Sequence, residues 1–209
     1  MEEAFEIPVG TFDEFFRSRG SSGENVASHW MPPQHRLKLI KYPPNASTDP
    51  GQGVGAHKDS SGWLTFLYQV GQEEGLEVVN SSGQWIQVPP IADSFVVNFG
   101  NAFEAATGGA VKATIHRVVA PKLRPRYSIP FFQGLPLDMT VTEATSRIPQ
   151  QVRALRRNED GSDTSQMASA FLDPRWDLLG ESQLRKWIRS HPDVGRKWYG
   201  EELVAYYTA

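Results

Sequence analysis

Three residues of the sequence have side chains suited to binding a transition metal. His57 and Asp59 are two positions apart, and His116 follows in the segment Thr-Ile-His-Arg-Val-Val. Because strand side chains repeat every second residue, we expect His57 and Asp59 to point to the same face of a strand. Two imidazoles and one carboxylate make up the facial triad that binds Fe(II) and leaves coordination positions open for oxygen chemistry. The three residues therefore predict a non-haem iron site.

A second pair, Arg126 and Ser128, has the same spacing and follows His116 in the sequence. A guanidinium and a hydroxyl on one strand face can together bind a carboxylate. Taken alone, His-x-Asp also fits a hydrogen-bonded pair at a strand end, and Arg-x-Ser fits a solvated strand face. All five residues in this order favour a metal site beside an anion site, and hence an enzyme that binds an acidic co-substrate at the metal.

The composition narrows the function classes further. The chain has 209 residues, a formal net charge of −3 and no cysteine. This length fits one domain, and without a basic cluster we expect no nucleic-acid binding. Without cysteine, any metal must be bound by nitrogen and oxygen ligands. The acidic N-terminus lacks a signal-peptide pattern and no segment is apolar enough to span a bilayer, so we expect a cytoplasmic protein with no membrane partner.

Short apolar runs separated by glycine and proline begin at His35 and indicate an antiparallel double-sheet barrel. A polar turn is expected at residues 45–53. The expected strands are 36–42, 63–70, 76–79, 85–88, 94–99, 114–119 and 126–132.

Helices are expected on both sides of these strands. Thr11-Phe-Asp-Glu14 has the pattern of a capping box that opens a short helix through Arg17. Towards the C-terminus we expect a linker at 158–165 and an amphipathic helix at 181–190. This helix is expected to pack on the barrel, the alternative being a partner-binding helix. His191-Pro192 should end it and precede a last short helix.

Eight segments of the central region carry a family resemblance. They are Leu39-Ile-Lys-Tyr-Pro-Pro44, Gly55-Ala-His-Lys-Asp59, Leu64-Thr-Phe-Leu67, Gly75-Leu-Glu-Val78, Trp85-Ile-Gln-Val-Pro-Pro90, Ser94-Phe-Val-Val-Asn-Phe-Gly100, Thr114-Ile-His-Arg-Val118 and Arg126-Tyr-Ser-Ile-Pro-Phe-Phe132. In identity and order they resemble the C-terminal catalytic core of the 2-oxoglutarate and iron(II)-dependent oxygenases of the isopenicillin N synthase-like superfamily. The resemblance covers a little under half of the chain.

This resemblance implies a mainly β fold with flanking helices, built on a double-stranded β-helix (jelly roll). Residues 1–34 would form a short N-terminal helix and loop. Residues 35–137 would form the jelly-roll oxygenase domain. Residues 138–209 would form a C-terminal helical extension that packs on the barrel.

The resemblance also implies a role for each of the five residues. His57, Asp59 and His116 would bind Fe(II) and form the catalytic centre. Arg126 and Ser128 would bind the distal carboxylate of 2-oxoglutarate, whose keto acid end would chelate the metal next to O2.

Three further residues are expected at the site, two of them supported by the resemblance and Trp63 by its place after the metal carboxylate. Tyr42 matches a tyrosine that reaches 2-oxoglutarate in many members, although a tyrosine in the core is an equal alternative. Phe132 is on the same face of the expected strand as Arg126 and Ser128, and it is expected to contact the substrate. Trp63 ends the loop that follows the metal carboxylate and is expected to rim the pocket. Asn101 stands where members of the family commonly have an aspartate after the glycine, and at this expected turn position the difference is expected to have little effect.

The implied function is the hydroxylation, desaturation or cyclisation of a small organic molecule, in secondary metabolism or elsewhere. Two alternatives stay open: an oxidase of the same fold that needs no 2-oxoglutarate, and a truncated, non-catalytic jelly roll that binds a ligand or partner. Members usually carry a long segment ahead of the barrel, so we expect a shortened form or a fragment in which one sheet exposes apolar surface. The sequence does not indicate an oligomeric state.

Overall fold

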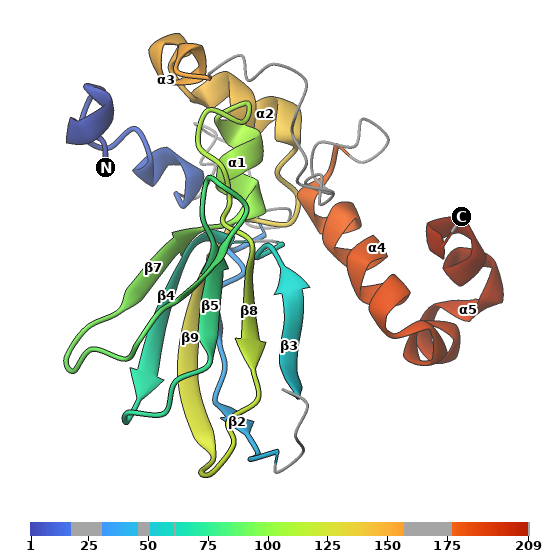
Figure 1. The fold of residues 1–209 in the computed structure, drawn as a ribbon. Coiled ribbons are helices and arrows are strands. Elements are labelled where there is room, and N and C mark those ends of the chain that lie inside the picture. The colour runs from blue at the N-terminus through green and yellow to red at the C-terminus, as the bar shows by residue number, and fades with distance from the viewer. Residues whose placement is uncertain (18–30, 46–50, 61, 157–176, 209) are drawn as a thin grey trace.

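In the described residues, nine strands form two antiparallel sheets that curve around a common interior (Figure 1). The computed structural model describes residues 1–17, 31–45, 51–60, 62–156 and 177–208. The first sheet consists of β1 (Arg36–Leu37), β2 (Ile40–Tyr42), β9 (Arg126–Gly134), β4 (Gly62–Val70) and β7 (Val96–Phe99). The second sheet consists of β3 (Gln52–His57), β8 (His116–Val119), β5 (Leu76–Val79) and β6 (Trp85–Gln87).

The order of the strands identifies the architecture. In the first sheet it is β1-β9-β4-β7, with β2 also paired to β9, and in the second it is β3-β8-β5-β6. Most neighbours in space are distant in sequence, because the chain crosses between the sheets several times. This is the predicted double-stranded β-helix, with helices on its flanks as expected.

The expected strand positions agree with the structure except near the start of the barrel. Residues 36–42 form two short strands, and β3 begins at Gln52, inside the region where a polar turn was expected. Two glycines in β3 give it little intrinsic strand preference, but its pairing with β8 decides the conformation. The pairs join Gln52 to Val119, Val54 to Val118 and His57 to His116.

One apolar core closes the end of the barrel at which α1 (Asn101–Ala106) lies. It joins Phe15 near the N-terminus, Trp63 of β4 and Phe103 of α1, and the rings of both phenylalanines lie within 4.7 Å of the Trp63 ring. Residues of α2 (Val141–Arg147) and α3 (Gln150–Ala154) complete this core. The expected divisions at residues 34 and 137 therefore do not separate independent cores.

The outer face of the first sheet is apolar and open to solvent. Leu37 pairs with Phe131, which pairs with Phe66, and Phe66 pairs with Val97. Leu37, Val97 and Phe131 are exposed, as are Leu39 (79%) and Phe95 (62%) beside them. This surface, named the outer face below, matches the expectation that one sheet exposes apolar side chains.

The expected capping box at Thr11–Glu14 is wrong. The structure has a short 3-10 turn, η2 (Asp13–Phe15), preceded by another, η1 (Glu3–Phe5). The Thr11 hydroxyl donates to the Pro8 carbonyl at 2.6 Å and so does not cap a helix. The Glu2 carboxylate instead accepts from the backbone amides of Gly10 and Phe12.

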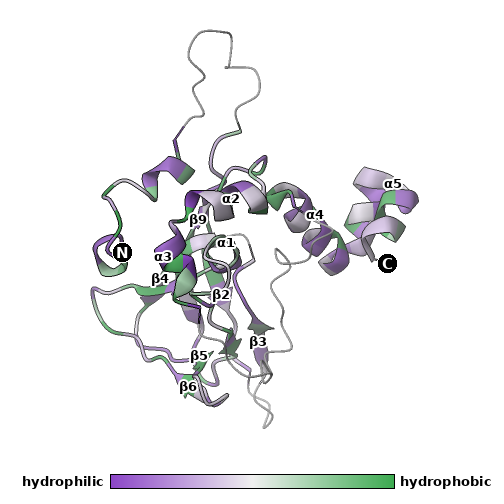
Figure 2. Ribbon diagram, turned by 90° about the horizontal axis from the view of Figure 1, so that it is seen from above, coloured by the Kyte–Doolittle hydropathy of each residue, from purple (hydrophilic) through white to green (hydrophobic). Residues whose placement is uncertain are grey.

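Two C-terminal helices lie beside the barrel, with α5 farther from the sheets than α4 (Figures 1 and 2). They are α4 (Leu179–Ser190) and α5 (Pro192–Thr208), and the latter is interrupted at Gly200, where φ is 82°. The break at His191-Pro192 is as predicted. Leu179 joins the barrel core, but Ile188 packs mainly on α5, so α4 contacts the barrel with only part of its apolar face. The linker expected at 158–165 lies outside the described residues.

Within the described part of the chain, no helix has the length and apolar character needed to cross a bilayer.

Candidate active site

The three predicted metal ligands converge at one end of the barrel interior. His57 is the last residue of β3, His116 is the first of β8, and these two residues are paired across the strands. Asp59 Oδ1 lies 3.8 Å from His57 Nε2 and 3.6 Å from His116 Nε2. The three ligand atoms lie within 4.8 Å of one another. Asp59 lies beyond the end of the strand, so its approach to His57 depends on the following loop and not on strand periodicity alone.

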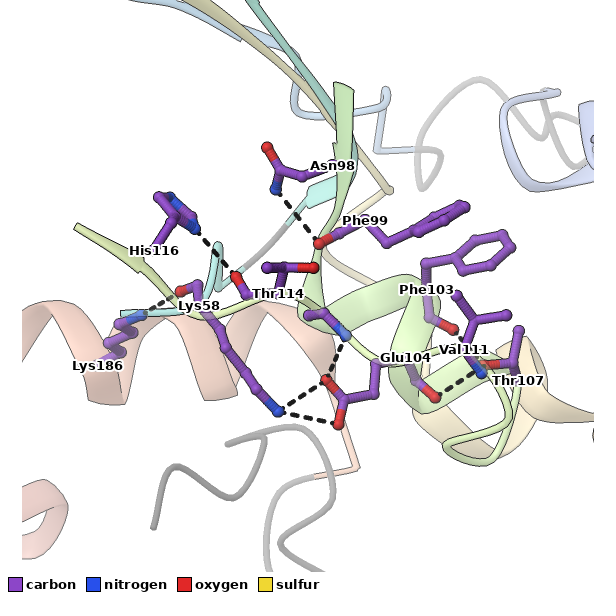
Figure 3. Close-up of polar contacts among 11 residues, drawn as sticks. Lys58, Asn98, Phe99, Phe103, Glu104, Thr107, Val111, Thr114, His116 and Lys186 are labelled. Carbon is purple, nitrogen blue, oxygen red and sulfur yellow. Dashed lines mark hydrogen bonds and ion pairs between the residues drawn. The ribbon is translucent and has the colours of Figure 1, made fainter. Parts of the chain in front are cut away.

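Each histidine ligand is oriented through its other ring nitrogen. Nδ1 of His57 contacts the Gly55 carbonyl at 2.8 Å, and Nδ1 of His116 contacts the Thr114 carbonyl at 3.0 Å (Figure 3). A carbonyl accepts only from a protonated nitrogen, so in the neutral form of each ring the lone pair is on Nε2, the nitrogen that faces the metal position.

The carboxylate of Asp59 is oriented in the same way. Its Oδ2 accepts from Thr65 Oγ1 at 2.7 Å and from Asn98 Nδ2 at 2.8 Å. Oδ1 therefore faces the two imidazoles. Asp59 is buried, so these two hydrogen bonds are shielded from water. The donor set of two neutral imidazoles and one carboxylate suits Fe(II), and its geometry leaves one side of the metal position open to the interior.

Burial lowers the pKa of His57, and the neighbouring imidazole of His116 lowers it further. The Gly55 carbonyl and the Asp59 carboxylate oppose this shift. The net effect favours the neutral ring, which is the form that binds a metal.

A buried ion pair lies beneath the metal ligands (Figure 3). Lys58, between two of the ligands in sequence, places its Nζ 3.1 Å from both carboxylate oxygens of Glu104 on α1. Glu104 also accepts from the backbone amide of Ala113, three residues before His116. One carboxylate thus connects the two chain segments that carry the ligands. The pair was not foreseen, because its members are 46 residues apart and no local pattern links them.

The turn expected at Gly100-Asn101 is wrong, because a helix begins here. Asn101 begins α1, and its backbone amide donates to the Asp59 carbonyl at 2.8 Å. The start of this helix therefore helps to position the loop that carries the metal carboxylate.

The predicted anion site lies at the other end of the same interior. Arg126 and Ser128 are each 1% exposed and point inward from β9. Arg126 Nη2 donates to Gln69 Oε1 at 2.7 Å. Arg126 Nε, Arg126 Nη1 and Ser128 Oγ are buried and have no hydrogen-bond partner among the described residues. Buried polar atoms rarely lack partners, so these atoms indicate a site that an anionic ligand completes.

Tyr42 lies at this end too. The Arg126 guanidinium lies 5.1 Å from the centre of the Tyr42 ring. Burial lowers the pKa of Arg126 and Tyr42 opposes the shift, so the guanidinium remains charged at neutral pH. Tyr42 also packs against Leu76 and Val118, and so the core interpretation and the ligand interpretation both fit its position.

A cavity of about 370 Å³ connects the two ends. Its wall contains the triad, the anion pair and Tyr42, and is otherwise mostly aliphatic. Phe132 lines it on the same face of β9 as Arg126, which agrees with the position expected for a substrate contact.

Trp63 does not fit its predicted role as a substrate contact. It is 2% exposed and packs on Phe12, Phe15 and Phe103, on the side of β4 that faces the core. The inward-facing residue of this region is Thr65, which lines the cavity and holds Asp59. Strand alternation places residues 63 and 65 on one face, but the register shift between Gly62 and Leu64 disturbs this pattern.

Comparisons with known proteins agree with this geometry. Residues 33–134 match the family model described as 2OG-Fe(II) oxygenase superfamily. The chain is 38% identical over 206 residues to the 2-oxoglutarate-dependent dioxygenase frbJ of Dothideomycetidae sp. (strain 11243). It is 32% identical over 213 residues to a 2-oxoglutarate-dependent dioxygenase of Gibberella zeae. Each alignment covers 95% of this chain and 52% of the relative, so the chain spans about half the length of these curated relatives.

A solved structure gives a similar result. The dioxygenase for auxin oxidation 1 from Arabidopsis thaliana, solved as a binary complex with 2-oxoglutarate, superimposes with a TM-score of 0.51 and 27% sequence identity. The match covers 66% of this chain and 46% of that one. Together with the triad and the anion site, these matches show that residues 33–134 form a domain of the 2OG-Fe(II) oxygenase superfamily.

Proposed function

We propose that this protein is a 2-oxoglutarate-dependent, non-haem Fe(II) dioxygenase that oxidises a small organic molecule. The observation that carries the proposal is the pairing, in one cavity, of an Fe(II)-type triad with buried donors that lack partners among the described residues. The names of the relatives support the same reaction class. The oxidation would be a hydroxylation, a desaturation or a cyclisation.

In this proposal, the chain's residues position the reactants. His57, Asp59 and His116 would hold Fe(II). When bound, Fe(II) and 2-oxoglutarate supply the activation of O2, with succinate and carbon dioxide as products of the co-substrate. Arg126 and Ser128 would donate to the distal carboxylate of 2-oxoglutarate and so fix the distance of its other end from the metal. The aliphatic cavity wall would exclude water from the reacting atoms.

Two measurements test the proposal. Anaerobic titration of the Fe(II)-loaded protein with 2-oxoglutarate should produce the visible charge-transfer band of a chelated metal. After O2 is added, 2-oxoglutarate should be converted to succinate, and this conversion should be slow when no substrate is present. A band that never forms would favour an oxidase that uses no 2-oxoglutarate, and iron that is not retained at all would favour a non-catalytic jelly roll.

A further inference from the structure

A second cavity, of about 500 Å³, lies between the barrel and α4. Lys38 lines both this cavity and the one that holds the triad, so the two spaces adjoin. From this second cavity we propose that the substrate carries an oxyanion, such as a carboxylate, which binds between Lys38 and Lys186 while its apolar body extends towards the metal position. This inference rests on the proposed function and names the substrate class of the same site.

The charged residues that line the second cavity are the first argument for an anionic substrate. Arg36, Lys38 and Lys186 line it, and none of its described lining residues is an aspartate or a glutamate. A partly open space lined by several cations and by no described acid attracts anions.

The second argument rests on the position of Lys186 and on N–H donors that have no acceptor among the described residues. It extends from α4, and its Nζ lies 3.5 Å from the carbonyl oxygen of Lys58 (Figure 3). Lys58 stands between His57 and Asp59 in sequence, so an anion on Lys186 would lie next to the metal ligands. An ammonium has three N–H donors, and this contact uses one at most. Burial lowers the pKa of Lys186, Asp59 opposes the shift and Arg36 adds to it.

The third argument comes from Lys38 and Phe132, which lie where the two cavities adjoin. The Lys38 ammonium lies 5.5 Å from the centre of the Phe132 ring, and the Arg36 guanidinium lies 5.9 Å from it. Phe132 thus presents an apolar surface towards the triad, with cations beside it. A molecule with one charged end and one apolar end matches this arrangement.

Aromatic side chains line the far wall of the second cavity. Trp187 and Tyr199 are in edge-to-face contact at 6.2 Å, and both line the space. They offer an apolar surface for a flat organic body, and so we expect aromatic acids to bind better than small aliphatic ones.

Equilibrium binding tests this inference without relying on turnover. The full chain is loaded anaerobically with Fe(II) and saturating 2-oxoglutarate, so that the Arg126 site is filled. Binding of phenylacetate, phenyl phosphate and the neutral 2-phenylacetamide is then measured by calorimetry. We expect at least one of the two anions to bind about tenfold more tightly than the amide. The anion that binds better identifies the carboxylate or the phosphate as the preferred group.

Three variants locate the effect. Lys186→Gln and Lys38→Gln should each reduce the preference for the anion several-fold, and Lys38 is exposed, so its variant provides a second test should Lys186→Gln fail to fold. Lys122→Gln is the matched control, since this exposed lysine lies in the turn between β8 and β9 and should leave the preference unchanged.

Equal binding of anions and amide, or a preference that both cavity variants retain, would overturn the inference. Failure of the proposed function would give another result. In that case no succinate would form, although the protein would still bind the anion more tightly than the amide and would lose this preference in the Lys38 and Lys186 variants.

Discussion

The two ends of the barrel interior differ in how completely their polar atoms are satisfied. At the metal end, the second polar atom of every ligand side chain already has a partner within the protein. At the anion end, three buried polar atoms of Arg126 and Ser128 have none among the described residues. The first end is arranged before any ligand arrives, whereas the second needs its ligand to complete it.

This contrast has an energetic meaning. A carboxylate bound at the anion end would accept charge-assisted hydrogen bonds from Arg126 and Ser128, each worth about 1.5–3 kcal/mol. At the metal end the hydrogen bonds reduce the reorganisation needed for metal uptake. We therefore expect substitutions at the metal end to affect folding and metal together, and substitutions at the anion end to affect the co-substrate alone.

The largest effect is expected from His116→Ala, because two ligands hold Fe(II) poorly. Iron content after desalting should fall to background, as measured by elemental analysis. His191→Ala, at the end of α4, is the control and should retain iron like the wild type. Full iron retention by the His116 variant would show that the triad is not the metal site.

Glu104→Gln should come next, since it leaves the buried Lys58 ammonium without its ion partner. Breaking a buried pair in this way costs about 3–5 kcal/mol of folding stability, which denaturant unfolding measures. Glu77→Gln is a matched control: Glu77 pairs with Arg117 at 2.6 Å in a more exposed position, where the expected loss is about 1 kcal/mol or less. Similar losses in both variants would contradict a special role for the Lys58–Glu104 pair.

Arg126→Gln should separate the two ends most clearly. It removes the charged donors of the anion site, and we expect the affinity for 2-oxoglutarate to fall about 100-fold, on the basis of two charge-assisted hydrogen bonds. Iron content should stay near the wild-type value. In thermal unfolding, 2-oxoglutarate should stabilise the wild type but not the variant. Loss of iron in this variant would show that the two ends are not independent.

Thr65→Val should loosen the metal carboxylate without removing a ligand. It deletes the 2.7 Å hydrogen bond to Asp59 Oδ2, and losses of this kind reduce metal affinity about 10–100-fold. Competition with a chelator gives the affinity. Thr65→Ser keeps the hydroxyl and should restore most of it, and a valine variant with unchanged affinity would exclude the positioning role.

A change of pH should give the smallest effect and act on one end only. Because burial and His116 lower the pKa of His57, protons should begin to displace iron only below the ordinary histidine value of about 6.5. Arg126 stays charged throughout, so 2-oxoglutarate affinity should be constant between about pH 6.5 and 8. Release of iron above about pH 6.5 would contradict the lowered pKa of His57.

The sequence was sufficient for the five central residues and for most strands. His57, Asp59, His116, Arg126 and Ser128 were recognised by type and spacing, and the structure brings all five to one cavity. The jelly roll followed from the resemblance and from the alternation of short apolar runs.

What the sequence could not give depends on contacts between distant segments. The bond between Asn98 and Asp59 spans 39 residues, and the Lys58–Glu104 pair spans 46. The Trp63 prediction failed because this residue belongs to β4 and not to a loop, and packs on Phe15 and Phe103, which are distant in sequence. The predicted capping box at Thr11 does not form, because the Thr11 hydroxyl donates to the Pro8 carbonyl instead of capping a helix.

The alternation of β9 has a practical consequence for handling the protein. Arg126 and Ser128 face the interior, while Tyr127 and Phe131 emerge on the opposite side of the same strand. Leu39 and Phe95 line neither the cavity that holds the triad nor the one beside α4, so charged residues at these two positions would leave both walls unchanged, whereas Val97 of the outer face also lines the triad cavity. Solubility engineering and catalytic engineering of this barrel are separable tasks.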